Sequence, residues 1–425
     1  MLLSYLLQFF ALFVVRYSRL FINLFARARY QPAPRPKHPN YGSNNVICYI
    51  PSVNCSGINF QKTVQSAILT GCRTVYISTI QSATENAHAV CDSFRTRVCI
   101  LADEERPNKR MQVSGVEEEE RIKLILCLDD HVWMEDPAEF LADTIAPFEN
   151  PVIGGVAVGK KVECLRTASG VPCHLLNLLG CFYLLRHNWE LCASNTLDGG
   201  VFVISGRAAC FRAEILTDHE FMTAFLSEYF AQPFFGQQIG PLHADDDNFV
   251  TRWLIGKGWK IKFQHTRYAC IITSLGVDGP HKWLQQCIRW SRTTIRSNLT
   301  SLSNMKVWFT YPWTTVTVYI PALCNYALLI DPCLLWLSWQ AAVDIGASPC
   351  FALLVLVAWM LVTKVIKIYP HLHAYPEDIW LLPVQFGFGY LHSLIKLYST
   401  LTFWKLGWGS RPDQNTDING ITLHG

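Results

Sequence analysis

Three short motifs contain residue types that can act on phosphate and hydroxyl groups. The first, Asp129-Asp130-His131, directly follows an apolar run that ends at Leu128. Two carboxylates and an imidazole at the end of a strand can hold a divalent cation, which would offset the charge of a diphosphate. The alternative is a helix N-cap in a solvated turn, because aspartate is a favoured cap residue. The motif alone leaves both interpretations open.

The second motif is the acidic triplet Asp245-Asp246-Asp247, which leads into a helix-like stretch. Neighbouring carboxylates repel one another, so at least one pKa should rise where the site is partly desolvated. A carboxylate with a raised pKa suits a general base that takes a proton from a sugar hydroxyl. A helix N-terminus is the alternative, because negative charge there is favourable to the helix dipole.

The third motif is Gln286-Cys287-Ile288-Arg289-Trp290. On a helix, Arg289 and Trp290 lie three and four residues after Gln286, so the three side chains project from one side. The amide can bind hydroxyls, the guanidinium can fork onto phosphate oxygens, and the indole can stack on a pyranose ring. A structural stack of arginine on tryptophan is the alternative.

The composition limits the classes of protein to which the chain can belong. Of its 425 residues, 50% are apolar and only 16% are charged, against a typical charged share of about 25%. The net charge of +3, from 36 basic and 33 acidic residues, is too small to indicate nucleic-acid binding. The sixteen cysteines include no C-x-x-C pair. We therefore expect neither a zinc module nor a secreted disulfide framework. We expect reduced thiols that face the cytosol.

Residues 44–305 hold most of the charge and have the pattern of an α/β domain. A helix-like stretch is expected at Gln61–Leu69. Strands are expected at Val46–Ile50, Arg73–Ile80, Ile122–Leu128, Val201–Ser205 and Trp259–Gln264. Strands that alternate with helices predict a mostly parallel sheet covered on both faces, and such sheets bind ligands beyond the carboxyl ends of their strands.

Residues 1–26 are mostly apolar, and basic residues such as Arg27 and Arg29 follow them in a Pro-rich linker over 27–43. A secretory signal has the opposite order of charge. We therefore expect a non-cleaved membrane helix whose C-terminal end is cytosolic. An interfacial helix is the alternative, because the uncharged run is short for a full crossing.

Residues 306–405 are again apolar and predict further membrane helices. Uncharged runs at 307–330 and 345–363 are each long enough to cross roughly 30 Å of hydrocarbon. A third run, 379–395, contains a proline and two glycines and is expected to be a re-entrant or interface segment. The flanking basic residues predict a multi-pass protein whose α/β domain and tail, 406–425, are cytosolic.

In this order, the motifs resemble the family 2 inverting glycosyltransferases that polymerise sugars at membranes. Gln286–Trp290 matches the Q-x-x-R-W helix of that family at every fixed position. Asn195–Arg207 is similar to the acceptor-side segment of hyaluronan synthases, and Trp408-Gly409-Ser410-Arg411 is similar to the W-G-T-R that closes them. A fungal capsular-polysaccharide-synthase-like branch is the nearest relative that we suggest. The resemblance covers about residues 44–411 and implies a GT-A-type nucleotide-sugar fold.

The resemblance also implies roles for single residues. Asp246 is implied as the catalytic base, and Asp247 takes that role if the alignment slips by one residue. The implied ligands of Mn²⁺ or Mg²⁺ are Asp129, Asp130 and His131. The implied nucleotide-binding residues are Pro51, Asn54, Ser78, Thr79 and Asp129. The implied substrate-binding residues are Lys109, Arg110, Gln286, Arg289, Trp290, Ser205, Gly206, Trp408 and Arg411.

The function that this resemblance implies is a polysaccharide synthase of a membrane, which we expect to be the plasma membrane. It would transfer sugar from a UDP-sugar to a growing β-linked polymer of hyaluronan, chitin or glucan type, with inversion, and would extrude the product. One alternative is a single-transfer glycosyltransferase with a lipid acceptor, such as a ceramide. The other is a catalytically inactive membrane scaffold, because the second strand ends in Ser78-Thr79 and lacks the family's acidic pair.

Overall fold

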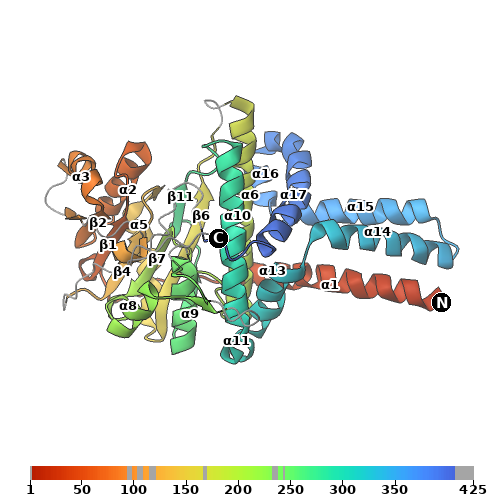
Figure 1. Ribbon diagram of the computed structural model, residues 1–425, viewed down its shortest axis with the longest axis horizontal. Coiled ribbons are helices and arrows are strands. Elements are labelled where there is room, and N and C mark those ends of the chain that lie inside the picture. Colours follow the sequence, from red (N-terminus) through yellow and green to blue (C-terminus); the bar gives the residue numbers. More distant parts are fainter. Residues whose placement is uncertain are drawn as a thin grey trace.

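The chain forms an α/β body from which a bundle of long helices projects (Figure 1). The structure, a computed structural model, describes residues 2–92, 98–102, 109–113, 121–165, 170–231, 238–242 and 245–406. Trp408 and Arg411, both expected to bind substrate, lie outside the described residues. Two further long helices stand between the body and the bundle, α6 (Gly170–Leu197) and α10 (Pro280–Leu302).

One sheet of nine strands forms the centre of the described part of the body, in the order β3-β2-β1-β4-β7-β6-β11-β5, with β10 also paired to β6. Its strands are β1 (Val46–Pro51), β2 (Thr74–Thr79), β3 (Val98–Ala102), β4 (Leu124–Leu128), β5 (Val132–Trp133), β6 (Ile153–Val162), β7 (Ala208–Arg212), β10 (Lys260–Gln264) and β11 (Cys270–Thr273). β1 runs parallel to β2 and β4, whereas β7 runs antiparallel to β4 and β6. The predicted α/β fold with a mostly parallel sheet is confirmed.

Helices cover both faces of this sheet, because every residue of β1 is buried and its successive side chains point to opposite faces. Val46, Cys48 and Ile50 pack into one apolar core, and Ile47 and Tyr49 pack into the other. The first core includes α2 (Gly57–Leu69), α3 (Thr84–Cys91) and α5 (Pro137–Ile145). The second includes α6, α8 (His219–Leu226) and α9 (Asp246–Lys257). The remaining elements of the body are the short helices α4 (Lys109–Val113) and α7 (Ala213–Leu216) and the hairpin strands β8 (Phe230–Ala231) and β9 (Gln238–Ile239).

One expected strand is not a strand. Val201–Ser205 is an extended loop in which the backbone N–H of Ile204 donates to the Thr251 hydroxyl at 2.9 Å, and the next strand, β7, begins at Ala208. The run is apolar because Val201 and Ile204 are buried under α9 and α6, and not because it joins the sheet. β6 was not expected, since its glycines and two lysines conceal the buried pattern.

The C-terminal part contains a series of helices that connect the body to the bundle. They are α11 (Met305–Thr310), α12 (Pro312–Thr314), α13 (Ile320–Cys324), α14 (Ala327–Asp344), α15 (Pro349–Ile366), α16 (Tyr369–Ala374) and α17 (Leu382–Thr400), with short stretches of other helix types at Thr315–Tyr319 and Pro376–Leu381. The uncharged run 307–330 was expected to be one membrane helix, and this expectation is wrong. Its first half packs on the body through buried Thr315 and Tyr319, and the chain bends by 93° before α14.

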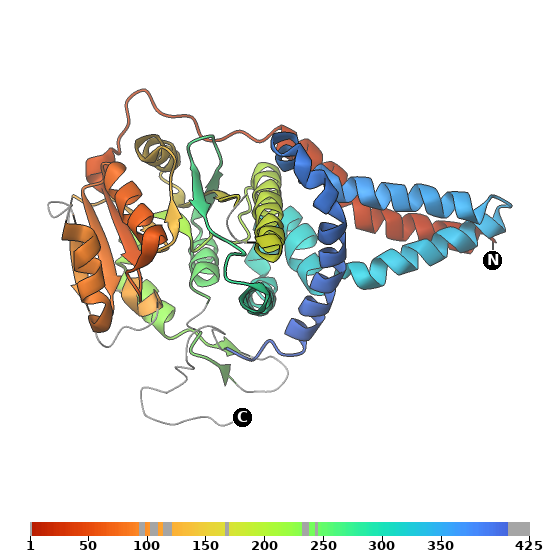
Figure 2. The same cartoon turned by 90° about the horizontal axis from the view of Figure 1, so that it is seen from above.

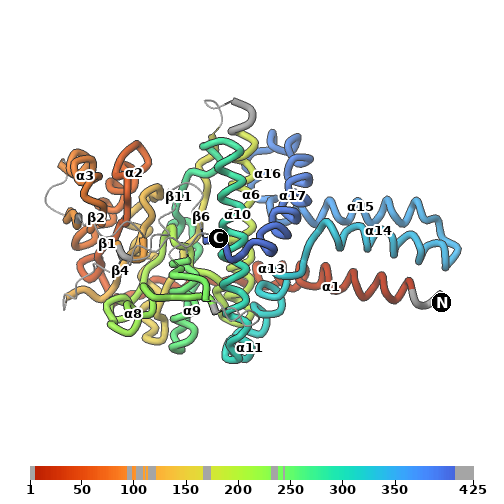
Figure 3. The backbone as a smooth tube through the Cα atoms, viewed as in Figure 1, coloured from red at the N-terminus to blue at the C-terminus, as the bar shows by residue number. Residues whose placement is uncertain are grey.

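Among the described residues, two helices are long and apolar enough to cross a membrane, Tyr5–Ala28 within α1 (Leu2–Ala28) and α15, and the bent pair that includes α14 would be a third crossing. These helices indicate membrane association. α1, α14 and α15 lie side by side, with the N-terminus and the α14–α15 connection at the far end (Figures 1 and 2). In the tube of Figure 3 the same three helices extend beyond α16 and α17.

The expected re-entrant or interface segment, 379–395, lies mostly in α17, which runs across the base of the bundle and not along it (Figure 2). α17 also packs beside α10 of the body, and its Ile395 belongs to the same apolar cluster as Trp283 and Cys287. Arg16 of α1 pairs with Asp331 of α14 at 3.0 Å near the base. α17 thus lies between α14 of the bundle and α10 of the body.

Candidate active site

Lys109 lies at the centre of the acidic residues that the sequence singled out. Its ammonium group is 2.6 Å from Asp129 Oδ1, 3.0 Å from Asp246 Oδ2 and 2.9 Å from the carbonyl oxygen of Gly206. Burial lowers the pKa of Lys109, but the two carboxylates outweigh burial and the pKa is raised well above its usual value. The lysine therefore stays charged and joins the turn after β4, the start of α9 and the loop before β7.

Asp247 differs from its neighbour Asp246 in its surroundings. One carboxylate oxygen of Asp247 accepts from the backbone N–H of Gly206 at 3.4 Å, and the other accepts from the N–H of Asn248. Burial, and then the charge of Asp246, raises the pKa of Asp247 to about 6, although Lys109 acts in the opposite direction. A carboxyl group with this pKa can both accept and release a proton near neutral pH.

The third member of the triplet, Asp245, has a structural role. It forms a fully buried ion pair with Arg296 of α10, with a distance of 3.1 Å between Oδ2 and Nε. Since one helix turn is about 3.6 residues, Arg296 lies two turns beyond Arg289 on the same helix. The pair fixes the acidic start of α9 against the helix that carries the Q-x-x-R-W motif.

Arg289 of that motif interacts electrostatically with this centre. Burial, and then the charge of Arg207, lowers the pKa of Arg289, while Asp246, Asp247 and Asp129 act to raise it. The guanidinium group therefore lies close to all three carboxylates. The third predicted member of the motif, Gln286, is half-buried on the preceding turn of α10.

Trp290 belongs to an aromatic and cationic group that the sequence analysis missed. The ring of Tyr183 stacks on its indole with centroids 5.2 Å apart and planes 10° from parallel, and the Arg207 guanidinium lies 5.3 Å from the indole centroid. Tyr183 and His187 are four residues apart on α6 and so share a face. This spacing was visible in the sequence but is common in ordinary helices.

Lys160 of β6 completes this group and was also missed. Its ammonium group lies 3.1 Å from His187 Nδ1, and its side chain is buried. Burial, and then the charge of Arg207, lowers the pKa of Lys160 to about 7, and burial also keeps His187 neutral by lowering its pKa. A lysine within an apolar, buried strand was the signal that could have identified it, because lysine is almost never fully buried without a specific partner.

The three expected metal ligands do not converge on one point. Asp129 faces Lys109, whereas Asp130 accepts from the Ser52 hydroxyl at 2.7 Å and lies 3.0 Å from His131 Nδ1. Among the described residues, the acidic motif is not one of the groups whose ligand atoms lie close together. Of the three expected metal ligands, Asp129 is therefore the one that borders Lys109 and the acidic centre.

Four of the five expected nucleotide-binding residues lie at or just beyond the carboxyl ends of β1 and β2, and most of these are buried; the fifth, Asp129, follows β4. Pro51 pairs with Ser78 across the two strands. Ser78 is 4% exposed and Thr79 is fully buried, with its hydroxyl 3.2 Å from the Cys55 thiol. Asn54 is exposed in the turn after β1. Of these residues, Asn54 has the side chain that is accessible to a nucleoside.

Arg110, expected to bind substrate, instead points into the protein. It is 1% exposed, and its guanidinium donates to the carbonyl oxygen of Phe225 at 2.6 Å and pairs with Glu228 at 2.7 Å. Adjacent residues of a short helix such as α4 point in different directions, so Lys109 and Arg110 cannot both face the acidic centre. The structure therefore assigns Arg110 to the protein core.

We expect Arg110→Met to destabilise the protein without changing its affinity for a donor. Removal of one partner from a buried ion pair costs up to about 3–5 kcal/mol, and the loss here should lie at the lower end of that range because Glu228 keeps its ion pair with Arg252. Lys282→Met is the matched control, since Lys282 pairs with Asp278 on the exposed surface, and exposed pairs contribute about 0–1 kcal/mol. Thermal unfolding followed by tryptophan fluorescence, with donor titrations, measures both effects. A weakened donor affinity with unchanged unfolding would contradict the assignment.

Ser205 and Gly206, expected on the acceptor side, border the acidic centre. Ser205 is buried, and its hydroxyl accepts from the N–H of Arg207 at 3.4 Å. A Cβ atom at Gly206 would lie 3.0 Å from Lys109 Nζ and 3.3 Å from Asp246 Oδ2. The absence of a side chain at this position lets the lysine approach the loop.

Gly206→Ala is therefore expected to lower kcat/KM by about tenfold or more, since small misplacements of catalytic groups have effects of up to about a hundredfold. The flexible end of Lys109 can move away from the new methyl group, so the unfolding temperature should not change. Gly256→Ala, on α9 with open space around its Cα, is the control and should keep full activity. Equal activity of both variants would show that the close approach is unimportant.

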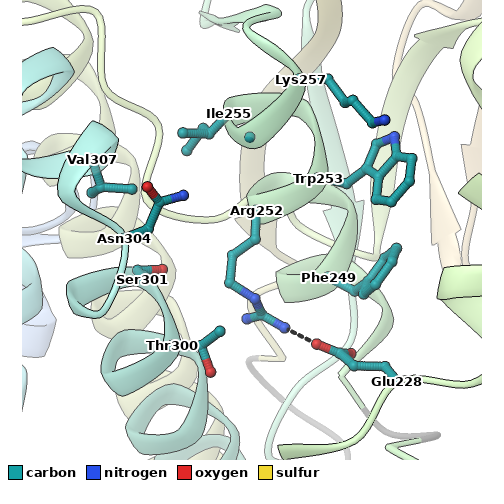
Figure 4. Close-up of a pocket in the computed structure, with 11 residues that line it drawn as sticks. Glu228, Phe249, Arg252, Trp253, Ile255, Lys257, Thr300, Ser301, Asn304 and Val307 are labelled. Atoms are coloured by element: carbon teal, nitrogen blue, oxygen red, sulfur yellow. Dashed lines mark hydrogen bonds and ion pairs between the residues drawn. The ribbon is translucent and has the colours of Figure 1, made fainter.

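A pocket of about 500 Å³ lies elsewhere, between α9 and the end of α10 (Figure 4). Its walls include Arg252, Trp253 and Asn304, and Arg252 pairs there with Glu228 at 2.5 Å. None of the residues expected in the active site lines it. The sequence motifs and this cavity thus mark different places.

Comparisons with known proteins agree with the geometry. A family described as "Glycosyltransferase like family 2" matches residues 62–293. A "Type 2 glycosyltransferase" of Zymoseptoria tritici is 32% identical over 99% of this chain and 87% of its own length. One of Pyricularia oryzae, with the same description, is 32% identical over 96% of this chain and 83% of its own.

A solved structure is similar over almost the whole chain. The mannosyltransferase PcManGT from Pyrobaculum calidifontis, in complex with GDP-Man and Mn²⁺, covers 97% of this chain and is itself covered completely, with a TM-score of 0.55. Its sequence identity is 12%, so the likeness concerns the fold alone.

Proposed function

The chain belongs to glycosyltransferase family 2, and from that premise we propose that it transfers a sugar, with inversion, from a UDP-sugar to a hydroxyl group of a saccharide acceptor. The observation that carries the proposal is the position of Lys109 between Asp129 and Asp246, with Arg289 close to the same carboxylates. Lys109 and Arg289 thus provide two positive charges beside carboxylates from the end of β4 and the start of α9. Two such charges suit a diphosphate leaving group.

In this proposal Asp247 removes the proton from the acceptor hydroxyl. The oxygen of the acceptor hydroxyl then attacks C1 of the donor sugar from the face opposite the diphosphate. This single displacement forms one glycosidic bond, breaks the bond between C1 and the phosphate oxygen, and inverts C1. Asp246 was the first candidate from the sequence and Asp247 the second. The raised pKa of Asp247 and the ion pair of Asp246 with Lys109 support the second.

The acidic centre offers one carboxylate, that of Asp129, to a divalent cation such as Mn²⁺ or Mg²⁺. Such ions are commonly held by one or two carboxylates together with the phosphates of the substrate. Asp129, which is accessible beside Lys109, would be that carboxylate, whereas Asp130 and His131 bind one another. The cation would add positive charge at the diphosphate. A solved structural relative was obtained with GDP-Man and Mn²⁺.

The proposal places the reaction at the cytosolic face of a membrane that α1, α14 and α15 cross. With three crossings, the body and the end of α17 are on one side, and the basic residues at the base of the bundle favour the cytosol by the positive-inside rule. The acceptor then is a growing β-linked polymer, with the plasma membrane as the place of export. A fluorescent fusion, together with protease protection of the N-terminus, tests this topology.

A lipid-linked acceptor is a second candidate, and the bundle itself favours it. The centre of the bundle is filled by Tyr17, Leu334, Leu356 and Met360, so a polymer that crosses the membrane needs another route. At the base, four cations surround two acids: Arg16 and Lys364 share Asp331, and Arg19 and Lys367 share Glu190. The surplus of positive charge suits a lipid-linked phosphate.

One experiment tests both candidates. The purified protein in lipid nanodiscs is incubated in turn with radiolabelled UDP-glucose, UDP-N-acetylglucosamine and GDP-mannose, with and without a polyprenyl phosphate. A product of high molecular mass supports the polymer, and a product that is extracted into organic solvent supports the lipid acceptor. If no donor is consumed and calorimetry detects no UDP binding in the presence of Mn²⁺, the protein is a membrane scaffold and the proposal is wrong.

A further inference from the structure

Three side chains that commonly bind metals converge far from the acidic centre. The ligand atoms of Cys164, Cys181 and His371 all lie within 4.8 Å of one another, and the two sulfur atoms are 3.5 Å apart. Within the described part of the chain, no other set of three such residues meets this criterion. Cys164 and Cys181 are 17 positions apart and His371 follows Cys181 by 190 positions, so no local sequence motif indicates the site.

A second set of contacts surrounds the histidine. His371 Nε2 lies 2.7 Å from Asp378 Oδ2, and both side chains are 8% exposed. His174 Nε2 lies 3.7 Å from the other oxygen of Asp378. Histidines that bind metals almost always donate their second ring N–H to a carboxylate, which fixes the tautomer and the ring orientation. With Nε2 held in this way, Nδ1 is the nitrogen left for an ion.

From this geometry we propose that Cys164, Cys181 and His371 bind a structural zinc ion. Two thiolates and an imidazole select zinc over the oxygen-preferring Mg²⁺ and Mn²⁺. Both thiols lose a proton to solvent when the ion binds, so the bound site carries no net charge from the ion and the two thiolates. A water molecule would supply the fourth ligand of the tetrahedron.

The distance between the sulfur atoms distinguishes this site from a disulfide. A disulfide bond is about 2.05 Å long. Two sulfurs at about 2.3 Å from a tetrahedral zinc ion are about 3.8 Å apart. The observed 3.5 Å is close to the second value, so little movement is needed to admit the ion.

The position of the site indicates what the ion would do. Cys164 follows β6, and Cys181 lies on α6. His371 lies on α16, and Asp378 lies in the short helix Pro376–Leu381 that joins α16 to α17. Beside them α6 and α16 already pack through an apolar cluster that includes Phe182 and Ile368. Tyr183, which stacks on Trp290, is two residues from Cys181. The zinc ion therefore fixes the base of the membrane bundle to the helix that carries the aromatic group.

The wild-type protein gives the first test, which does not depend on any variant folding. Full-length protein purified without chelators is expected to contain about one zinc per chain by mass spectrometry of metals. Replacement of zinc by Co²⁺ should produce the sulfur-to-cobalt charge-transfer band and the visible bands of a tetrahedral thiolate site. Removal of the ion should lower the unfolding temperature. A metal-free protein with no cobalt spectrum, or one in which Cys164 and Cys181 are joined as a disulfide, overturns the proposal.

Variants then assign the ligands. Cys181→Ser and His371→Gln should each lose the zinc and the charge-transfer intensity. Cys192→Ser is the matched control, because Cys192 is buried on the same helix but outside the cluster, and it should retain the full metal content. Equal zinc content in all three variants would show that the ion, if present, binds elsewhere, and the assignment would then be wrong.

Discussion

Asp247→Asn is expected to lower kcat by about 10²–10⁴-fold, the usual contribution of a general base, while donor binding stays unchanged. Asparagine has nearly the same shape and can still accept from the N–H of Gly206, but it cannot take a proton. Initial rates with saturating donor give kcat, and calorimetric titration with UDP gives the binding. A variant with near wild-type kcat would exclude Asp247 as the base.

The pH dependence of the reaction separates Asp247 from Asp246. The base acts only when deprotonated, so with a pKa of about 6 for Asp247 the wild-type kcat/KM should fall tenfold per pH unit below pH 6 and level off above it. Since the charge of Asp246 raises that pKa, Asp246→Asn should move the acidic limb to lower pH. The residual activity of Asp247→Asn should lack the limb. If Asp246→Asn loses the limb instead, Asp246 is the base.

The parts of the site that the sequence could predict are those set by strand ends and helix periodicity. β4 ends at Leu128, so Asp129 had to lie at the carboxyl edge of the sheet. Arg289 and Trp290 follow Gln286 at helical spacing and were therefore expected on one side of α10. These inferences need only local structure, and for that reason the acidic motif and the Q-x-x-R-W helix were identified without coordinates.

Tertiary packing decided what the sequence could not. Lys109 and Arg110 are equivalent in a sequence, but one faces Asp129 and the other pairs with Glu228. The hydroxyl of Thr79 suggested a nucleoside contact, but it is turned towards Cys55. The absence of a C-x-x-C pair argued against zinc, because spacing along the chain does not reveal ligands that come from separate helices. Each of these differences depends on a contact between residues distant in the chain.

Lys109 joins the two halves of the acidic centre, and Lys109→Met is accordingly expected to have the other large effect. Electrostatic groups that stabilise a developing charge typically contribute about 10²–10³-fold, so kcat/KM should fall by this amount. The affinity for UDP should fall as well, because Asp129 and Asp246 would then repel a diphosphate without compensation. Measurements of kcat/KM and of UDP binding test both effects.

Two further variants distinguish a role in binding the diphosphate from a role in folding. Lys109→Arg keeps the charge and should recover part of the activity, although its planar group does not reproduce the three contacts of the ammonium. Lys109→Met leaves two uncompensated carboxylates, and combining it with Asp246→Asn removes one of them while Asp129 remains. The double variant should recover part of the unfolding temperature that Lys109→Met loses, but not kcat/KM. Recovery of both by the double variant would mean that Lys109 only neutralises Asp246, and its proposed contact with the leaving group would be wrong.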